Sequence, residues 1–214
     1  MFGENYLYFG SCRYMNLFSN HYPGRLHTTK EIIQFLTNKP SREVMLKNDD
    51  ANFQYGDINN EIVSKIYAKC NITYDVKNLV LEISTNKYYV FKNMIYNKFY
   101  YDAVHKGHLH LPLIQSHEDI IEDLKIIKSF FNNDTKIFII THYDGYVNNQ
   151  FIGSRHSLVQ FLVSLNIENV KIINVTNSFG KIYNLLKITY NDKIHYKYEY
   201  EQKIFKYVCE QINA

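Results

Sequence analysis

Short apolar segments alternate along this chain with amphipathic segments of helical spacing, and this alternation is what most constrains the fold. Residues 6–9, 78–84, 136–141 and 170–175 are apolar runs of the length and residue type of buried strands. Wholly apolar strands separated by helices are typical of a parallel sheet with helices on both faces. We therefore predict an α/β fold with three α/β/α layers and a mostly parallel, flavodoxin-like central sheet.

Helix signals fill the intervals between these strands. Thr28 and Glu31 have the spacing of a capping box, and the helix that they begin should end before Pro40. Ser116, followed by two acidic residues, predicts a helix over 116–131. Further helices are predicted over 13–20, 58–69, 154–165 and 197–212, and a weaker strand over 185–190. Because the sequence contains no internal repeat and no linker, we predict one domain spanning 1–214.

Composition narrows the classes of function. The chain has 214 residues, of which 46% are hydrophobic and 21% charged, as in a soluble globule with a sizeable core. It has no run long enough to span a membrane, its first residues lack the pattern expected of a secretory leader, and its three cysteines are not closely spaced. We therefore expect a cytoplasmic protein without disulfides. The net charge of +3 comes without a basic block, which argues against nucleic-acid binding.

Each predicted strand ends in small polar residues. In parallel sheets the carboxyl ends of the strands meet at one edge, where functional groups gather. Four such ends at one edge predict a functional site rather than unrelated loops. The residues are Gly10-Ser11, Ser84-Thr85-Asn86, Thr141-His142 and Val175-Thr176-Asn177.

Ser11 and His195 suggest nucleophilic catalysis. Gly10 permits a turn after the first strand, where exposed backbone N–H groups would face a ligand beside Ser11. Asp192 precedes His195 by three residues, so its carboxylate could orient the imidazole. A serine needs such an oriented base to take its proton. The alternatives are an ordinary strand-to-helix turn at Ser11 and an exposed loop at His195.

The Gly10-Ser11-Cys12 block, together with Asp192-x-x-His195 before the last helix, resembles the SGNH hydrolase superfamily, and the Gly-Ser-Cys form is similar to its GSCFA-like branch. The resemblance implies Ser11 as nucleophile, Asp192 as acid and His195 as base. The family usually completes its oxyanion hole with a Gly-x-Asn block, which is missing here. Ser84 or Asn86 would have to substitute for it, beside the backbone N–H of Ser11.

The resemblance implies an activity of acyl transfer or ester cleavage. We expect an acetyltransferase that uses acetyl-coenzyme A and acts on a sugar-type acceptor, because a mildly basic protein suits the phosphates of coenzyme A or a nucleotide sugar. The composition is that of an AT-rich genome, and the chain is similar to giant-virus domains that acetylate an amino sugar, which would place it in a host cytoplasm. A carbohydrate esterase without a cofactor and a non-catalytic binding domain are the alternatives, and the oligomeric state is not predicted.

Other residues have open roles. Cys12 is an alternative nucleophile, as a thiolate paired with His195. His142 and Asp144 either bind substrate or satisfy a buried turn. The candidate phosphate ligands are Arg13, Arg25 and Arg155. The alternate spacing of three histidines disfavours a metal cage: His105, His108 and His110. Two cysteines are expected in the core, Cys70 and Cys209. No metal site is predicted.

Overall fold

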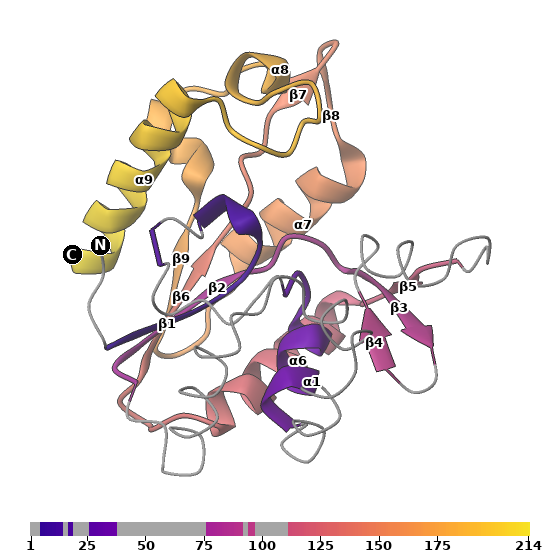
Figure 1. The fold of residues 1–214 in the computed structure, drawn as a ribbon, viewed down its shortest axis with the longest axis vertical. Helices are drawn as coiled ribbons and strands as arrows, with labels where there is room; N and C mark the ends of the chain where they lie inside the picture. The colour runs from indigo at the N-terminus through magenta and orange to yellow at the C-terminus, as the bar shows by residue number, and fades with distance from the viewer. Residues whose placement is uncertain (1–4, 15–16, 19–25, 38–75, 92–93, 97–110) are drawn as a thin grey trace, which may run out of the picture.

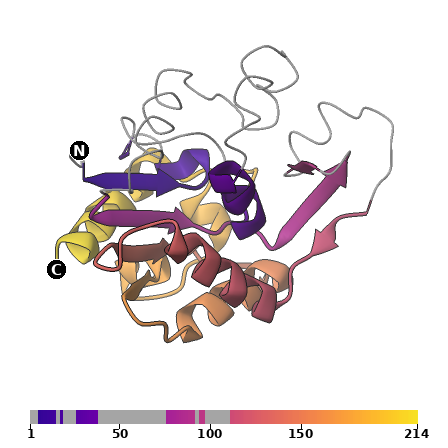
Figure 2. The same ribbon diagram turned by 90° about the horizontal axis from the view of Figure 1, so that it is seen from below.

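A four-stranded parallel sheet forms the centre of the molecule in a computed structural model, which describes residues 5–14, 17–18, 26–37, 76–91, 94–96 and 111–214 (Figure 1). The strand order is β1-β2-β6-β9. The strands are β1 (Tyr6–Phe9), β2 (Asn78–Glu82), β6 (Lys136–Ile140) and β9 (Val170–Ile173). All three pairings are parallel, and β1 and β2 run side by side in Figure 2. These strands confirm the four that the apolar runs predict.

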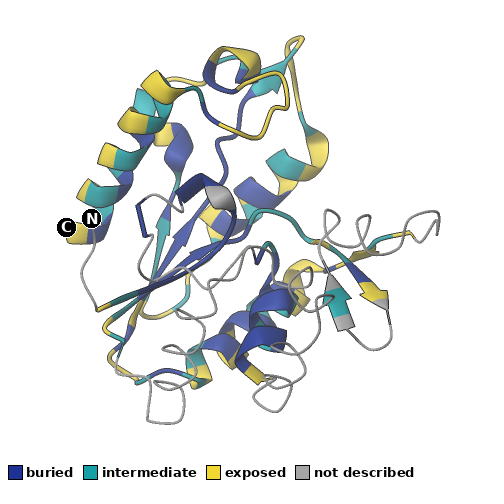
Figure 3. Ribbon diagram, in the orientation of Figure 1, coloured by how far each residue is buried: buried dark blue, intermediate teal, exposed yellow. Residues whose placement is uncertain are grey.

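Helices cover both faces of this sheet, which confirms the predicted α/β architecture. The helices α1 (Thr29–Thr37), α6 (His117–Ser129) and α7 (Gly153–Ser164) pack on one face, and α8 (Leu185–Ile188) and α9 (Tyr198–Asn213) on the other. Successive strand residues point to opposite faces, so Leu79 and Leu81 join the first core cluster and Val80 joins the second. Figure 3 shows the strands buried between helices whose outer sides are exposed.

Two predicted helix starts are confirmed in detail. In α6 the Asp119 N–H donates to Ser116 Oγ, and the Ser116 N–H donates to Asp119 Oδ2, both over 3.0 Å. Before α1, the Thr28 N–H donates to Glu31 Oε2 over 2.9 Å, and the Glu31 N–H donates to Thr28 Oγ1 over 3.2 Å. Each box satisfies backbone donors that a helix start leaves without partners. The predicted last helix is likewise present as α9.

The predicted strand over 185–190 is wrong, because the segment begins with the short helix α8. Asn184 caps it by accepting a hydrogen bond from the Leu186 N–H over 2.9 Å, and Leu185 and Ile188 are buried one turn apart. The predicted helix over 13–20 starts as a 3₁₀ turn, η1 (Cys12–Tyr14). The predicted helix over 58–69 lies outside the described residues, as do Arg25, Cys70, His105, His108 and His110.

Smaller elements surround the sheet. The strands β3 (Lys87–Phe91), β4 (Met94–Tyr96) and β5 (Leu113–Ile114) form a second sheet in the order β4-β3-β5. A hairpin joins β7 (Tyr146–Val147) to β8 (Gln150–Phe151), and the 3₁₀ helix η4 (Val175–Phe179) follows β9. Within the described part of the chain, no helix is both long and apolar enough to span a membrane.

Candidate functional site

Glu82, the last residue of β2, is the centre of a buried polar cluster at the carboxyl edge of the sheet. Its Oε2 accepts hydrogen bonds from Tyr8 Oη (2.8 Å), the Ser11 N–H (2.9 Å) and Ser11 Oγ (2.5 Å). Its Oε1 accepts from Arg13 Nε over 2.6 Å and lies 3.4 Å from His142 Nε2. Burial raises the pKa of Glu82, but the charge of Arg13 and the hydrogen bonds outweigh it and hold that pKa well below its usual value. The cluster is therefore built around an ionised, fully buried carboxylate.

Gly10 brings the first strand close enough to make these contacts. A Cβ on Gly10 would lie 2.7 Å from the Cβ of Glu82, which is closer than side-chain carbons approach. The glycine is thus required by the close approach of β1 to Glu82, in addition to the turn that the sequence predicts. This close approach places the N–H and the hydroxyl of Ser11 within hydrogen-bond distance of the Glu82 carboxylate.

His142 follows β6 and faces the guanidinium of Arg13. Arg13 Nη2 is in hydrogen-bond contact with His142 Nε2, and both side chains are buried. Burial, followed by the charge of Arg13, lowers the pKa of His142 to about 3, although Glu82 acts in the opposite direction. A neutral imidazole can accept the Arg13 proton at Nε2, whereas an imidazolium cannot. His142 is therefore a neutral acceptor near pH 7.

The depressed pKa of His142 predicts a pH-dependent stability. The unfolded chain binds this proton near pH 6.5 and the folded chain only near pH 3, so the stabilisation is complete above pH 6.5 and is lost as the pH falls towards 3. We expect His142 to account for about 2 kcal/mol of lost unfolding free energy between pH 8 and pH 5. Urea denaturation across this range measures it. His142→Gln should remove that slope, and His117→Gln, at an exposed histidine, should keep it; an unchanged slope in His142→Gln contradicts the assignment.

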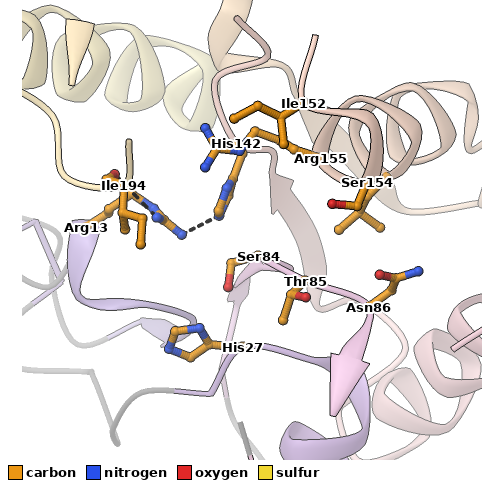
Figure 4. Close-up of a pocket in the computed structure, with 11 residues that line it drawn as sticks. Arg13, His27, Ser84, Thr85, Asn86, His142, Ile152, Ser154, Arg155 and Ile194 are labelled. Carbon is orange, nitrogen blue, oxygen red and sulfur yellow. Dashed lines mark hydrogen bonds between the residues drawn. The ribbon is translucent and has the colours of Figure 1, made fainter. Parts of the chain in front are cut away.

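A cavity of about 240 Å³ opens beside this cluster (Figure 4). Arg13, His142 and Arg155 of α7 lie on one side of it, where the Arg155 side chain runs toward His142. Arg155 donates to the Lys193 carbonyl over 2.8 Å, and no carboxylate forms an ion pair with it among the described residues. Burial lowers the pKa of Arg155, but its value starts so high that the group remains charged. Because Glu82 compensates the charge of Arg13, Arg155 brings the uncompensated positive charge that suits an anion.

Ser84 and Asn86, the predicted substitutes in the oxyanion hole, both line this cavity. The Ser84 Oγ is buried and has no hydrogen-bond partner within the described part of the chain. Asn86 Nδ2 donates to the Gln115 carbonyl over 3.3 Å. Of the two, Ser84 is the side chain with an unused hydroxyl at the cavity.

Asp192 and His195 form the predicted pair. Asp192 Oδ2 lies 2.6 Å from His195 Nδ1, while Asp192 Oδ1 accepts hydrogen bonds from the N–H groups of Ile194 and His195. Burial raises the pKa of Asp192, but these hydrogen bonds lower it below its usual value. The carboxylate is thus ionised near neutral pH and holds the imidazole through Nδ1.

The turn after β1 and the loop that contains His195 meet at the cavity, but Ser11 forms no hydrogen bond with His195 among the described residues. Arg13 Nη1 donates to the Ile194 carbonyl over 3.5 Å, and Ile194 lines the cavity. The Ser11 hydroxyl and N–H both donate to Glu82, and Ser11 is only 2% exposed. Ser11 therefore lacks the histidine contact and the unoccupied N–H that the predicted triad and oxyanion hole require.

Glu82 was missed by sequence reasoning, although one signal marks it. Glu82 directly follows the apolar residues 79–81, and a charge at the end of a buried strand needs a partner. Its partners cannot be read from the sequence, because Arg13 is 69 residues away. Of the other candidates, Cys12 begins η1. The described residues contain no group of three or more His, Cys, Asp or Glu side chains that could hold a metal ion.

Comparison of the chain with family models, curated proteins and solved structures gave no match in any of the three.

Proposed function

We propose that this protein transfers acyl groups at the Arg13–His142 cavity, through a covalent intermediate on the turn after β1 and with His195 as the general base. The observation that carries the proposal is the Asp192–His195 pair, formed at 2.6 Å in a loop that contacts Arg13 through the Ile194 carbonyl. A histidine held through Nδ1 by a carboxylate uses Nε2 to move protons. The resemblance to SGNH hydrolases supports the same roles for Asp192 and His195.

Cys12 rather than Ser11 is the nucleophile that we infer. The Ser11 hydroxyl donates over 2.5 Å to an ionised carboxylate, so an attack by it would break that contact and create a second negative charge beside Glu82. Cys12 lies next in the chain, beside Arg13, and thiols are better nucleophiles than hydroxyls. Ser11 then positions the turn through Glu82.

The reaction balances with this assignment. His195 takes the thiol proton as Cys12 attacks the carbonyl of an acyl thioester, and it returns a proton to the thiolate of the leaving group. An acceptor hydroxyl or amine then attacks the Cys12 thioester while His195 takes its proton. The acyl group leaves on the acceptor, and His195 returns the proton to the Cys12 sulfur.

The cavity wall favours a donor with phosphates. Arg155 is charged and has no carboxylate partner among the described residues, whereas the charge of Arg13 is compensated by Glu82. Guanidinium groups bind phosphate through paired hydrogen bonds. This supports acetyl-coenzyme A as the acyl donor.

Intact-mass detection of an acetyl adduct tests the proposal. The protein is incubated with acetyl-coenzyme A and no acceptor, and we expect an adduct in the unmodified chain and in Ser11→Ala. The adduct should be lost in Cys12→Ala and kept in Cys209→Ala, a matched control on α9.

Each other outcome has a definite meaning. An adduct lost in Ser11→Ala but kept in Cys12→Ala would restore the serine nucleophile that the family resemblance implies. Steady release of coenzyme A without an acceptor would make the protein a hydrolase. No adduct and no release in the unmodified chain would contradict acyl transfer and leave the binding-domain alternative.

A further inference from the structure

A second polar cavity, of about 330 Å³, lies at the carboxyl ends of β6 and β9. Gln160 of α7, residues of and around η4, and Asp144, two residues after His142, line it. None of its lining residues lines the Arg13–His142 cavity. It is therefore a separate site with its own chemistry.

Asp144 is held in place by one carboxylate oxygen, and its other oxygen has no partner. Oδ2 lies 2.7 Å from His156 Nδ1 and accepts from Gln160 Nε2 over 3.2 Å, while the Asp144 N–H donates to Thr176 Oγ1. The residue is 3% exposed, and its Oδ1 is buried without a hydrogen bond from any described residue. A buried carboxylate oxygen without a donor is unfavourable. A ligand hydroxyl is the kind of group that would satisfy it.

Residues with hydrogen-bond donors also line this cavity. Asn174 Oδ1 accepts from the Thr176 N–H over 3.1 Å, which leaves the Asn174 Nδ2 group to donate. Thr176 Oγ1 accepts from the Asp144 N–H, so its own proton is available. Lys181 lines the rim, with Nζ 5.0 Å from the centre of the Tyr183 ring. One acidic and one basic side chain therefore face the cavity among several neutral polar groups.

We propose that this second cavity binds the ring hydroxyls of an uncharged sugar. A hydroxyl both donates and accepts, so one sugar can donate to Asp144 Oδ1 and accept from Asn174 and Lys181. The carboxylate disfavours a phosphate, and Lys181 disfavours a cation. Ile182, at 45% exposure, offers the apolar contact that the C–H face of a sugar needs. The cavity volume falls within the range of roughly 300–1,000 Å³ that small-molecule sites occupy.

Equilibrium binding to the full chain tests this proposal. Methyl glucoside, methyl galactoside and methyl mannoside are titrated by ligand-observed NMR and by calorimetry, and we expect saturable binding of at least one. Asp144→Asn should weaken that binding at least about tenfold, because a hydrogen bond to a charged group is lost. Asp134→Asn, on an exposed turn, is the matched control and should bind like the unmodified protein.

A second variant keeps the proposal testable if Asp144→Asn fails to fold. Asn177 is an exposed residue of the cavity wall, and Asn177→Phe should fill the cavity and abolish binding without removing a buried group. Asn133→Phe places the same ring on an exposed turn and should have no effect. Absence of saturable binding for all three sugars, or binding that neither cavity variant weakens, would overturn the proposal. The acyl-transfer proposal is unaffected by either result, since no acyl donor is used and His195 is unchanged.

Discussion

Glu82→Gln should lower the free energy of unfolding by about 3–5 kcal/mol, the range seen when one partner of a buried ion pair is removed. The substitution leaves the buried Arg13 guanidinium without its counter-charge. It also replaces an ionised acceptor of the Tyr8 hydroxyl and the Ser11 N–H by a neutral amide. Urea denaturation followed by circular dichroism measures the change.

Glu122→Gln is the matched control for this experiment. Glu122 pairs with Lys125 at 2.6 Å, but their side chains are 65% and 62% exposed, so water screens the pair. Its denaturation midpoint should equal that of the unmodified protein. If the two glutamine variants had the same stability, the Glu82 cluster would not be the buried ionic centre that its contacts indicate.

His195→Ala should slow formation of the acetyl adduct by about a thousandfold, within the 10²–10⁴-fold range of general acid–base catalysis. Without the imidazole, the nucleophile keeps its proton and the leaving thiolate receives none. Rapid quenching followed by intact-mass analysis gives the rate. Asp192→Asn should also slow the reaction, because an amide no longer favours the imidazole orientation that Asp192 Oδ2 fixes at Nδ1.

An exposed histidine provides the control for this second experiment. His117 stacks on Phe161 with 3.9 Å between ring centroids, and neither residue lines the cavity. His117→Ala should form the adduct at the rate of the unmodified chain. An adduct that forms equally fast in His195→Ala would remove His195 from the mechanism, and the Asp192–His195 pair would then only shape the loop.

The predicted elements that proved correct depend on contacts between near neighbours in the chain. Ser116 and Asp119 cap α6 across three residues, and the buried strands follow from apolar runs of four to seven residues. Where local signals conflict, prediction fails: the segment around Leu185 and Ile188 has strand-like residues, but a cap from Asn184 and burial against the sheet make it a helix.

The candidate site likewise has some features that depend on residues near one another in the chain and others that depend on the tertiary structure. The sequence alone determined that polar residues collect at the carboxyl edge of a parallel sheet and that Asp192 can reach His195, because spacing of three residues and strand polarity decide both. Only the tertiary structure decided which group accepts the hydrogen bond of the Ser11 hydroxyl. Glu82 lies 71 residues from Ser11 along the chain, but the two residues are neighbours at the edge of the sheet. A buried, ionised carboxylate is a stronger hydrogen-bond acceptor than an imidazole in an exposed loop.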